Sequence, residues 1–244
     1  MKQNRLYNDL AYLWPVISPP EEYSLEAWHL REALRAKLGP GRHNLLELGV
    51  GGGHVLSHLA SEFQATAVDI SEQMLALSRQ LNPEVEHHLG DMRSVRLGRT
   101  FHAVLAHDAI TYMLSEDDMR AAFATARAHL EPGGVFIAVP DWFRETFKGT
   151  SVHHWIKQKD ALEVTLIEYV HDPDPTDTTI ESIFFFLLQE HGQLQIEQDQ
   201  HITGLFPLNT WLHLMSEAGF QVEEIRYPAY EGGYGGNLLV GVLM

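Results

Sequence analysis

The feature that most constrains the fold of this chain is a glycine-rich turn at residues 45–54, which read LLELGVGGGH. The apolar stretch 44–48 predicts a short buried strand, and residues 54–62 predict the helix that follows the glycines. Glycine lets a backbone adopt positive φ and approach a ligand closely. Asp69 lies at the end of a second predicted strand, 65–70, where a carboxylate can accept both hydroxyls of a ribose. Together these features predict a site for an adenosine-containing cofactor.

Strand and helix patterns alternate along the rest of the chain in the same way. Further strands are predicted at 85–89, 101–106 and 135–139, and helices at 71–81, with Ser71 as N-cap, and at 116–130. After an insert, the pattern resumes with a helix at 208–218 and strands at 221–226 and 237–243. Such alternation implies right-handed crossovers between parallel strands. We therefore predict an α/β fold with a doubly wound, mostly parallel sheet of seven strands.

Two segments depart from this alternation. Residues 1–40 predict a helical N-terminal cap on the cofactor-binding core at 41–140, and Gly39 and Gly41 flank Pro40 where the helical pattern stops. Within 141–205, three strand-like stretches with polar and apolar alternation predict an antiparallel β insert, which we interpret as a lid or substrate wall. A plain extension of the main sheet is the alternative. With the C-terminal helix and strands at 206–244, these parts make one domain.

The insert's strands are predicted at 163–170, 180–189 and 194–202, with a hairpin turn at His191 and Gly192. The exposed face of this insert could serve a homodimer as easily as a substrate.

Composition excludes several classes of protein. Lys and Arg number 17 against 33 Asp and Glu, a net charge of −16 that opposes nucleic-acid binding. The longest apolar run, 183–188, is too short to cross about 30 Å of hydrocarbon, so no membrane partner is expected. The N-terminus carries no apolar signal segment, which predicts a cytoplasmic protein. Cysteine is absent, and the 15 histidines show no metal-ligand spacing, so we expect neither a thiolate nucleophile nor a metal site.

The glycine turn also discriminates between cofactors. A dinucleotide fingerprint would need its third glycine at position 54 or 56, where the chain has His54 and Leu56. A P-loop would need a Gly-Lys-Ser/Thr sequence after the glycines, and none follows. What remains is an acid, Glu47, two residues before Gly49. A carboxylate at that point repels a pyrophosphate but suits a cationic amino-acid tail.

These residues resemble the first motif of the class I S-adenosylmethionine-dependent methyltransferases. The likeness continues in order through VDIS at 68–71, LGDM at 89–92, AHD at 106–108 and LEPGG at 130–134. The resemblance implies a Rossmann-like sheet and S-adenosylmethionine as cofactor. It assigns the methionine end to the glycine turn, the ribose to Asp69 and the adenine to Ile70, Asp91 and Met92. The implied cofactor-binding residues are Tyr23, Glu47, Gly49, Gly51, Gly53, Asp69, Ile70, Asp91, Met92 and His107.

A narrower resemblance covers more of the chain. The stretches GDMR at 90–93, YML at 112–114, PDWFRETF at 140–147 and ITGLF at 202–206 are similar to bacterial N,N-dimethyltransferases of nucleotide-linked 3-amino-hexoses, of the desosamine and mycaminose type. This likeness implies an amine acceptor and a tyrosine, here Tyr23, that closes over the cofactor carboxylate. The chain departs from the subfamily at 107–109, where His-Asp-Ala replaces small or hydroxyl residues.

The expected reaction needs no covalent catalyst, since the methyl group of a sulfonium is already activated. Positioning an acceptor lone pair in line with the carbon–sulfur bond is the main task. His107 and Asp108 are the candidates for orienting or deprotonating the acceptor, because the carboxyl end of strand four faces the crevice. Four aromatic residues either line an acceptor pocket or pack in the core, with the core favoured: Trp142, Phe143, Trp155 and Tyr234.

The sequence thus predicts a methyltransferase acting on a small molecule, most simply on an amine such as an amino-sugar nucleotide. Two alternatives stay open at this point. One is an O-methyltransferase on a small hydroxyl or carboxyl acceptor, and the other is a module of the same fold that binds the cofactor without turnover.

Overall fold

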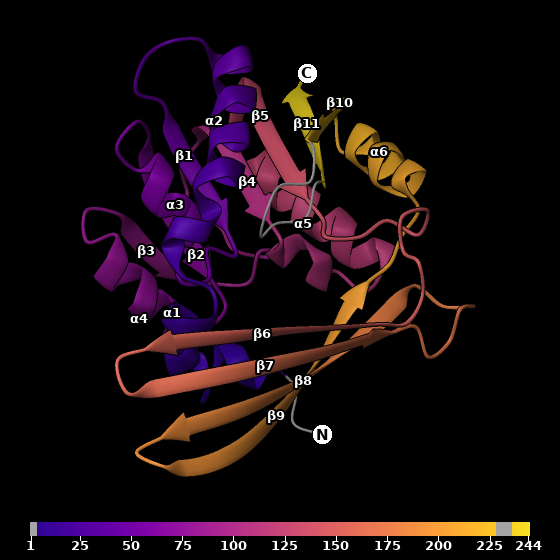
Figure 1. Ribbon diagram of the computed structural model, residues 1–244. Helices are drawn as coiled ribbons and strands as arrows, with labels where there is room; N and C mark the ends of the chain where they lie inside the picture. Colours follow the sequence, from indigo (N-terminus) through magenta and orange to yellow (C-terminus); the bar gives the residue numbers. More distant parts are fainter. Residues whose placement is uncertain (1–3, 228–235) are drawn as a thin grey trace.

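The structure is a computed structural model that describes residues 4–227 and 236–244 (Figure 1). Its larger sheet has seven strands in the order β10-β11-β5-β4-β1-β2-β3. All neighbours are parallel except β11, which runs antiparallel to both β5 and β10. The strands are β1 (Asn44–Leu48), β2 (Gln64–Asp69), β3 (Glu86–Leu89), β4 (Phe101–His107), β5 (Leu130–Val139), β10 (Phe220–Tyr227) and β11 (Gly236–Leu243). The predicted doubly wound, mostly parallel sheet of seven strands is confirmed.

Helices cover both faces of this sheet because the buried strands are apolar on both sides. Leu46 and Phe136 face α5 and α6, whereas their neighbours Leu45 and Ile137 face α2 and α3. The helices are α2 (Ser24–Leu38), α3 (His54–Leu59), α4 (Glu72–Leu81), α5 (Glu116–Ala128) and α6 (Leu208–Glu217). The hydroxyl of Ser71 accepts the Met74 N–H, which confirms the predicted N-cap of α4.

Several predicted boundaries are wrong by a few residues. The helix expected over 54–62 ends at Leu59, and the strand expected over 135–139 begins at Leu130. The helix expected to run to residue 130 ends at Ala128, because Leu130 already pairs with Phe101 at the start of β5. Leu130 completes the apolar spacing of the helix and also begins a buried strand, and the sheet pairing prevails.

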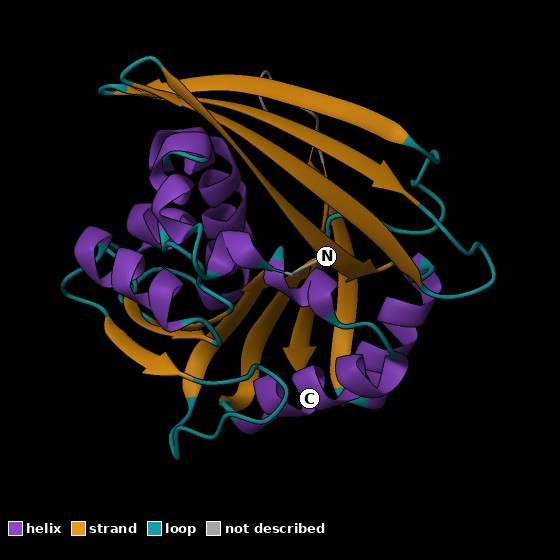
Figure 2. Cartoon of the chain, turned by 90° about the horizontal axis from the view of Figure 1, so that it is seen from below, coloured by secondary structure: helices purple, strands orange, loops and turns teal. Residues whose placement is uncertain are grey.

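The insert forms a separate four-stranded antiparallel sheet, which lies as its own layer beside the core (Figure 2). Its strands are β6 (Ser151–Lys159), β7 (Leu162–His171), β8 (Thr179–Glu190) and β9 (Gln193–Gly204). The hairpin turn is confirmed, since His191 and Gly192 both have positive φ, 50° and 77°. The sequence did not predict β6, because its residues SVHHWIKQK lack clean alternation of apolar and polar types.

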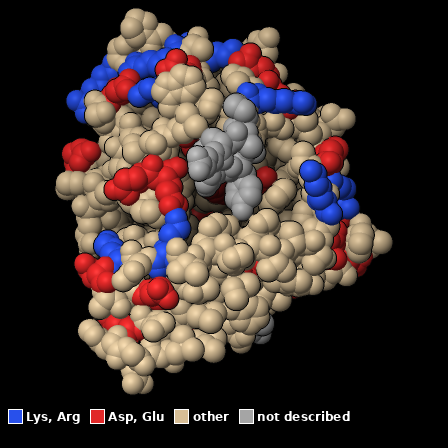
Figure 3. All heavy atoms as spheres, in the orientation of Figure 1, with Lys and Arg blue, Asp and Glu red and all other residues tan. Residues whose placement is uncertain are grey.

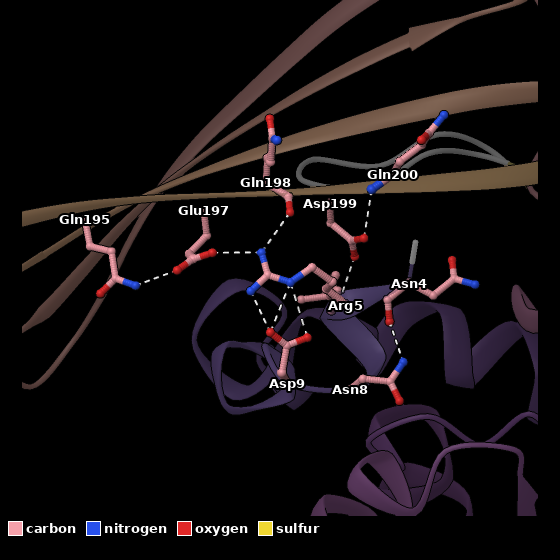
Figure 4. A network of polar contacts seen from close by, with 10 residues as sticks. Asn4, Arg5, Asn8, Asp9, Gln195, Glu197, Gln198, Asp199 and Gln200 are labelled. Carbon is pink, nitrogen blue, oxygen red and sulfur yellow. Dashed lines mark hydrogen bonds and ion pairs between the residues drawn. The ribbon is translucent and has the colours of Figure 1, made fainter. Parts of the chain in front are cut away.

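The N-terminal segment lies against the inner face of this second sheet. It consists of four short turns of helix: η1 (Arg5–Tyr7), η2 (Ala11–Leu13), α1 (Trp14–Ile17) and η3 (Pro20–Tyr23). Leu6, Leu10 and Leu13 pack in one cluster with Val164 and Phe186. Figure 4 shows the polar side of this contact. The guanidinium of Arg5 donates hydrogen bonds to the carboxylate of Asp9, just after η1, and to that of Glu197 on β9. The described residues include no helix long and apolar enough to cross a membrane.

Candidate active site

A cavity of about 640 Å³ lies where the carboxyl ends of β1, β2, β4 and β5 meet the N-terminal segment. Ligands of doubly wound sheets bind at this edge. All the candidate cofactor-binding residues named from the sequence line this cavity except Gly53, and so does Asp108. Side chains that the sequence did not single out line it as well, among them Tyr7, Trp14, Tyr112 and Asp141.

The glycine turn forms one wall through close backbone packing. Gly49 has φ 79°, and a Cβ there would lie 2.3 Å from the Cβ of Ala109, in the η4 turn (Ala109–Tyr112) that follows β4. Only glycine permits this approach of the two turns. Gly53 serves packing instead, since its Cβ would lie 2.3 Å from Ser78 Oγ of α4. The structure therefore places Gly53 between helices and off the cavity wall.

Unpartnered polar atoms lie next to this turn. Glu47 is 2% exposed, and its Oε2 atom has no hydrogen-bond partner. Burial raises the pKa of Glu47 to about 8, and a bound cation would lower it again. Trp14 Nε1 and His54 Nδ1 are also buried without partners, and burial lowers the pKa of His54 to about 4. An orphan carboxylate and an orphan indole N–H fit the ammonium and carboxylate of an amino-acid end, so the residues present fit the methionine part of S-adenosylmethionine.

The ribose and adenine positions follow along β2 and β3. Asp69 is buried, and its two carboxylate oxygens accept N–H groups of Gly51 at 2.7 Å and Ser71 at 2.8 Å. Each oxygen keeps a lone pair for a hydroxyl on the cavity side. Ile70 is 69% exposed although it is apolar, and it lies on the cavity wall, where a base can pack against it. Asp91 is bonded to Arg93, whose guanidinium holds the pKa of that carboxyl below its usual value.

His107 lies at the end of β4 in a buried ion pair. Its Nε2 atom is 3.0 Å from Glu26 Oε1 and 3.3 Å from Asp108 Oδ1, and the Tyr227 hydroxyl donates to Glu26 at 3.0 Å. Burial alone would lower the pKa of His107, but the charges of Asp108, Glu26 and Glu47 raise it to about 10. A protonated imidazole suits orienting a ligand better than removing a proton. The sequence missed Glu26, which lies 81 positions before His107 in the chain.

These side chains also form the one group in the described ranges, 4–227 and 236–244, that could hold a metal ion. Ligand atoms of Glu26, His107 and Asp108 lie within 4.8 Å of one another. Metal binding requires a neutral imidazole, whereas the raised pKa leaves His107 protonated at neutral pH. The ion pair accounts for the cluster, and the absence of a metal stays a prediction.

A second pair of acids opens onto the same end of the cavity. Asp108, with φ 44°, holds its carboxylate towards Asp141, and the two side chains are hydrogen-bonded. Desolvation in the cavity wall and the charge of Asp108 raise the pKa of Asp141 above its usual value. The hydroxyls of Tyr7 and Tyr112 lie 3.0 Å apart on this wall. This end of the cavity therefore offers negative charge and hydroxyl groups to a second ligand.

Sequence reasoning missed most of this acceptor end. Tyr112 and Asp141 lie in stretches that carried the resemblance, but nothing in their spacing predicted a functional role for them. No sequence pattern pointed to Tyr7. The described aromatic candidates lie in packing clusters, as the sequence favoured: Phe143 is in the main core, Trp142 packs on Phe147, and Trp155 packs beneath the second sheet. Tyr234 lies outside the described residues.

Comparisons with known proteins identify the family of the chain. The methyltransferase-domain family matches residues 45–134. The chain is 32% identical over 237 residues to the dTDP-3-amino-3,4,6-trideoxy-alpha-D-glucopyranose N,N-dimethyltransferase of Streptomyces venezuelae, covering 96% of this chain and 95% of the relative. The crystal structure of Streptomyces venezuelae DesVI superposes with a TM-score of 0.83 at 29% identity, covering 97% of this chain and 96% of that one.

A second solved structure holds the cofactor. It is S-adenosylmethionine-bound CalS10, an amino pentose methyltransferase of Micromonospora echinaspora, with a TM-score of 0.79 at 26% identity over 91% of this chain and 92% of that one. The present chain is thus a class I S-adenosylmethionine-dependent methyltransferase, and S-adenosylmethionine is its cofactor. Within that class it belongs to the family of the bacterial amino-sugar N,N-dimethyltransferases. Both resemblances seen in the sequence are confirmed.

Proposed function

We propose that the enzyme transfers two methyl groups, one after the other, to the amino group of a sugar carried on a nucleotide. The observation that carries the amine acceptor is the acid pair of Asp108 and Asp141, which opens onto the cavity beside the end of β4. Carboxylates accept hydrogen bonds from a neutral amino group and attract the ammonium that forms when it is methylated. The named relatives act on amino sugars attached to dTDP, which supports the sugar-nucleotide part of the proposal.

The residues of the chain bind, orient and exclude water. The cofactor supplies an activated methyl group on a sulfonium. In our proposal, Glu47 and the glycine turn hold its amino-acid end, Asp69 holds the ribose, and Ile70 and Met92 enclose the adenine. Tyr7, Tyr112 and the acid pair then direct the acceptor nitrogen towards the methyl carbon. Such positioning contributes roughly 7–11 kcal/mol in favourable cases, so no covalent intermediate is needed.

The direct test is methylation of matched acceptors. Purified enzyme with S-adenosylmethionine and a dTDP-3-amino-3,6-dideoxyhexose should yield mono- and dimethylated products by mass spectrometry. The control is the same sugar nucleotide with a hydroxyl in place of the amine, which should stay unmethylated because a neutral hydroxyl gains little from the acid pair. Methylation of the hydroxyl analogue alone would establish the O-methyltransferase alternative. Cofactor binding without turnover on any acceptor would establish the non-catalytic one.

Residues 141–205 are proposed to act as the substrate wall, since Ile202 of β9 lines the cavity. We keep the cytoplasmic location and the absence of a nucleic-acid partner as predictions. The net charge of −16 supports the latter, and Figure 3 shows Lys and Arg interspersed with acids on the face it presents.

We also propose that the enzyme is a homodimer joined through the outer face of the second sheet. Ile156, Leu187 and Ile196 lie in one row across that face by strand register, and Ile156 and Ile196 are about two-thirds exposed. Val152 and Phe185 extend the same apolar surface in neighbouring rows. Apolar faces of this kind mark protein–protein contacts, and a second copy offers an identical apolar face for pairing.

Ile196→Arg should convert the dimer to a monomer in sedimentation-velocity experiments, because a cation would be buried without a partner. Leu81→Arg, at an exposed apolar position on α4, should leave the oligomeric state unchanged. A wild-type enzyme that sediments as a monomer at micromolar concentration would contradict the proposal.

A further inference from the structure

A chain of hydrogen bonds leads from the cavity wall into the interior of the protein. The Tyr7 and Tyr112 hydroxyl oxygens are 3.0 Å apart, and Tyr112 Oη lies 2.6 Å from His201 Nδ1. His201 Nε2 in turn lies 2.8 Å from Asp199 Oδ2. The tyrosines line the cavity, whereas His201 and Asp199 of β9 are 3% and 0% exposed and lie behind them. Cofactor binding and positioning of the acceptor do not require His201 or Asp199.

The hydrogen bonds of this series all run in the same donor-to-acceptor direction, from Tyr7 to Asp199. The Asp199 carboxylate accepts the Leu6 N–H at 2.7 Å and the Gln200 N–H at 2.8 Å (Figure 4). Burial would raise the pKa of Asp199, but its hydrogen bonds from His201 and the backbone keep it below the usual value. A carboxylate only accepts, so His201 donates to it from Nε2, and in a neutral imidazole Nδ1 is then an acceptor. Tyr112 then donates to His201 and accepts from Tyr7.

We propose that these four residues form a proton relay that moves a proton from the methylated acceptor nitrogen to His201 between the first and second methyl transfers. The inference rests on the proposed function, since only an acceptor amine that reacts twice needs such a step. Methylation of a primary amine leaves a secondary ammonium, whose nitrogen has no lone pair for a second methyl group. That proton must leave while the acceptor is still bound if both transfers are to occur during one binding event.

The step balances in protons and electrons. The ammonium N–H bond breaks, its electron pair stays on nitrogen, and the proton bonds to the Tyr7 oxygen. The original hydroxyl proton of Tyr7 moves to Tyr112, and that of Tyr112 moves to His201 Nδ1. Both tyrosines end neutral, and an imidazolium faces the Asp199 carboxylate. When the product leaves, the reverse sequence returns the proton to water in the cavity.

Other groups near the site are less suited to store this proton. Asp108 and Asp141 accept hydrogen bonds from the acceptor, and a proton taken up there would remove negative charge that holds it. The groups packed around His201 besides Asp199 are the rings of Tyr7, Tyr112 and Phe184, with Glu168 of β7 close enough to interact. Burial raises the pKa of Glu168, whereas the pKa of Asp199 is held below its usual value. Asp199 is therefore the carboxylate partner of His201, and it lies away from the cavity.

The test compares His201→Asn and Tyr112→Phe with His171→Asn, a control in which the removed histidine pairs with Glu181 at 3.4 Å on the same sheet. Products are followed by mass spectrometry at pH 7 with excess S-adenosylmethionine. Both relay variants should accumulate the monomethyl product, with a second transfer slowed tenfold or more relative to the first, a modest part of the ~10²–10⁴ that proton transfer contributes. The deficit should shrink as pH rises, because hydroxide replaces the relay.

A second readout is independent of turnover. With ¹⁵N-labelled histidine, nuclear magnetic resonance should show resting His201 neutral at pH 7 with Nδ1 unprotonated. A resting imidazolium would overturn the relay, and so would equal ratios of mono- to dimethyl product in wild type and both relay variants. Accumulation of monomethyl product in Asp108→Asn alone would assign the proton to the acid pair instead. If the wild type methylates no amine, the proposed function fails, while the resonance result still reports on the relay's hydrogen bonding.

Discussion

Asp69→Asn is expected to bind S-adenosylmethionine at least about 100-fold more weakly than the wild type. The carboxylate of Asp69 holds the turn through the N–H groups of Gly51 and Ser71 and has lone pairs free for the ribose. Hydrogen bonds to a charged group contribute about 1.5–3 kcal/mol each, and 1.4 kcal/mol is a factor of ten in affinity. An asparagine NH₂ would also face a backbone N–H, two donors without an acceptor. Titration calorimetry with S-adenosylmethionine and S-adenosylhomocysteine measures the loss.

The chain contains a matched control for this substitution. Asp177 also accepts the N–H of the residue two positions on, Thr179, but in an exposed loop. Asp177→Asn should therefore keep the wild-type affinity. Wild-type affinity in Asp69→Asn, with an unchanged melting temperature in both variants, would show that another group holds the ribose.

The fold was predictable because its signals are local. Strand 44–48, the glycines and Ser71 each act on their immediate neighbours, and alternation of such elements admits few topologies. The cofactor half of the site followed for the same reason, since Glu47, Gly49 and Asp69 occupy fixed places around one strand–turn–helix–strand unit. Gly53 shows the limit of a motif: its spacing matched, but its contact is with α4.

The acceptor half could not be read from the sequence, because long-range packing assembles it. Tyr7 approaches Tyr112 only because the N-terminal segment packs beneath the second sheet. His201 lies on β9, 89 positions after Tyr112. A lone histidine in an alternating strand carries no mark of a buried partner. The same holds for Glu26, one of several acids on an ordinary helix until β4 brings His107 to it.

The second large effect concerns that ion pair and stability. The pKa of His107 is about 10 in the folded protein, against about 6.5 in an unfolded chain. A raised pKa means that folding favours the protonated form. The resulting stabilisation is fully present below about pH 6.5 and is lost as pH rises through about 10. Thermal unfolding of the wild type, followed by circular dichroism from pH 7 to 10, should therefore show a falling melting temperature.

Glu26→Gln should lower stability at pH 7 by about 3 kcal/mol, since breaking a buried pair costs about 3–5 kcal/mol and His107 can release its proton in part. For a chain of this size that is about 6–12 °C in melting temperature. The variant should also lose most of the decline between pH 7 and 10, because its His107 is less fully protonated at the start. A parallel pH profile in wild type and variant would contradict the assignment.

Glu32→Gln is the control on the same helix. Glu32 pairs with Arg31 at 3.7 Å, and its side chain is more than half exposed. Exposed pairs contribute about 0–1 kcal/mol, so this variant should match the wild type at every pH. If Glu32→Gln were as destabilising as Glu26→Gln, the loss would reflect the helix itself. A charged His107 stabilises the end of β4 if two results hold. The loss of unfolding free energy must be confined to Glu26→Gln, and it must shrink as His107 deprotonates.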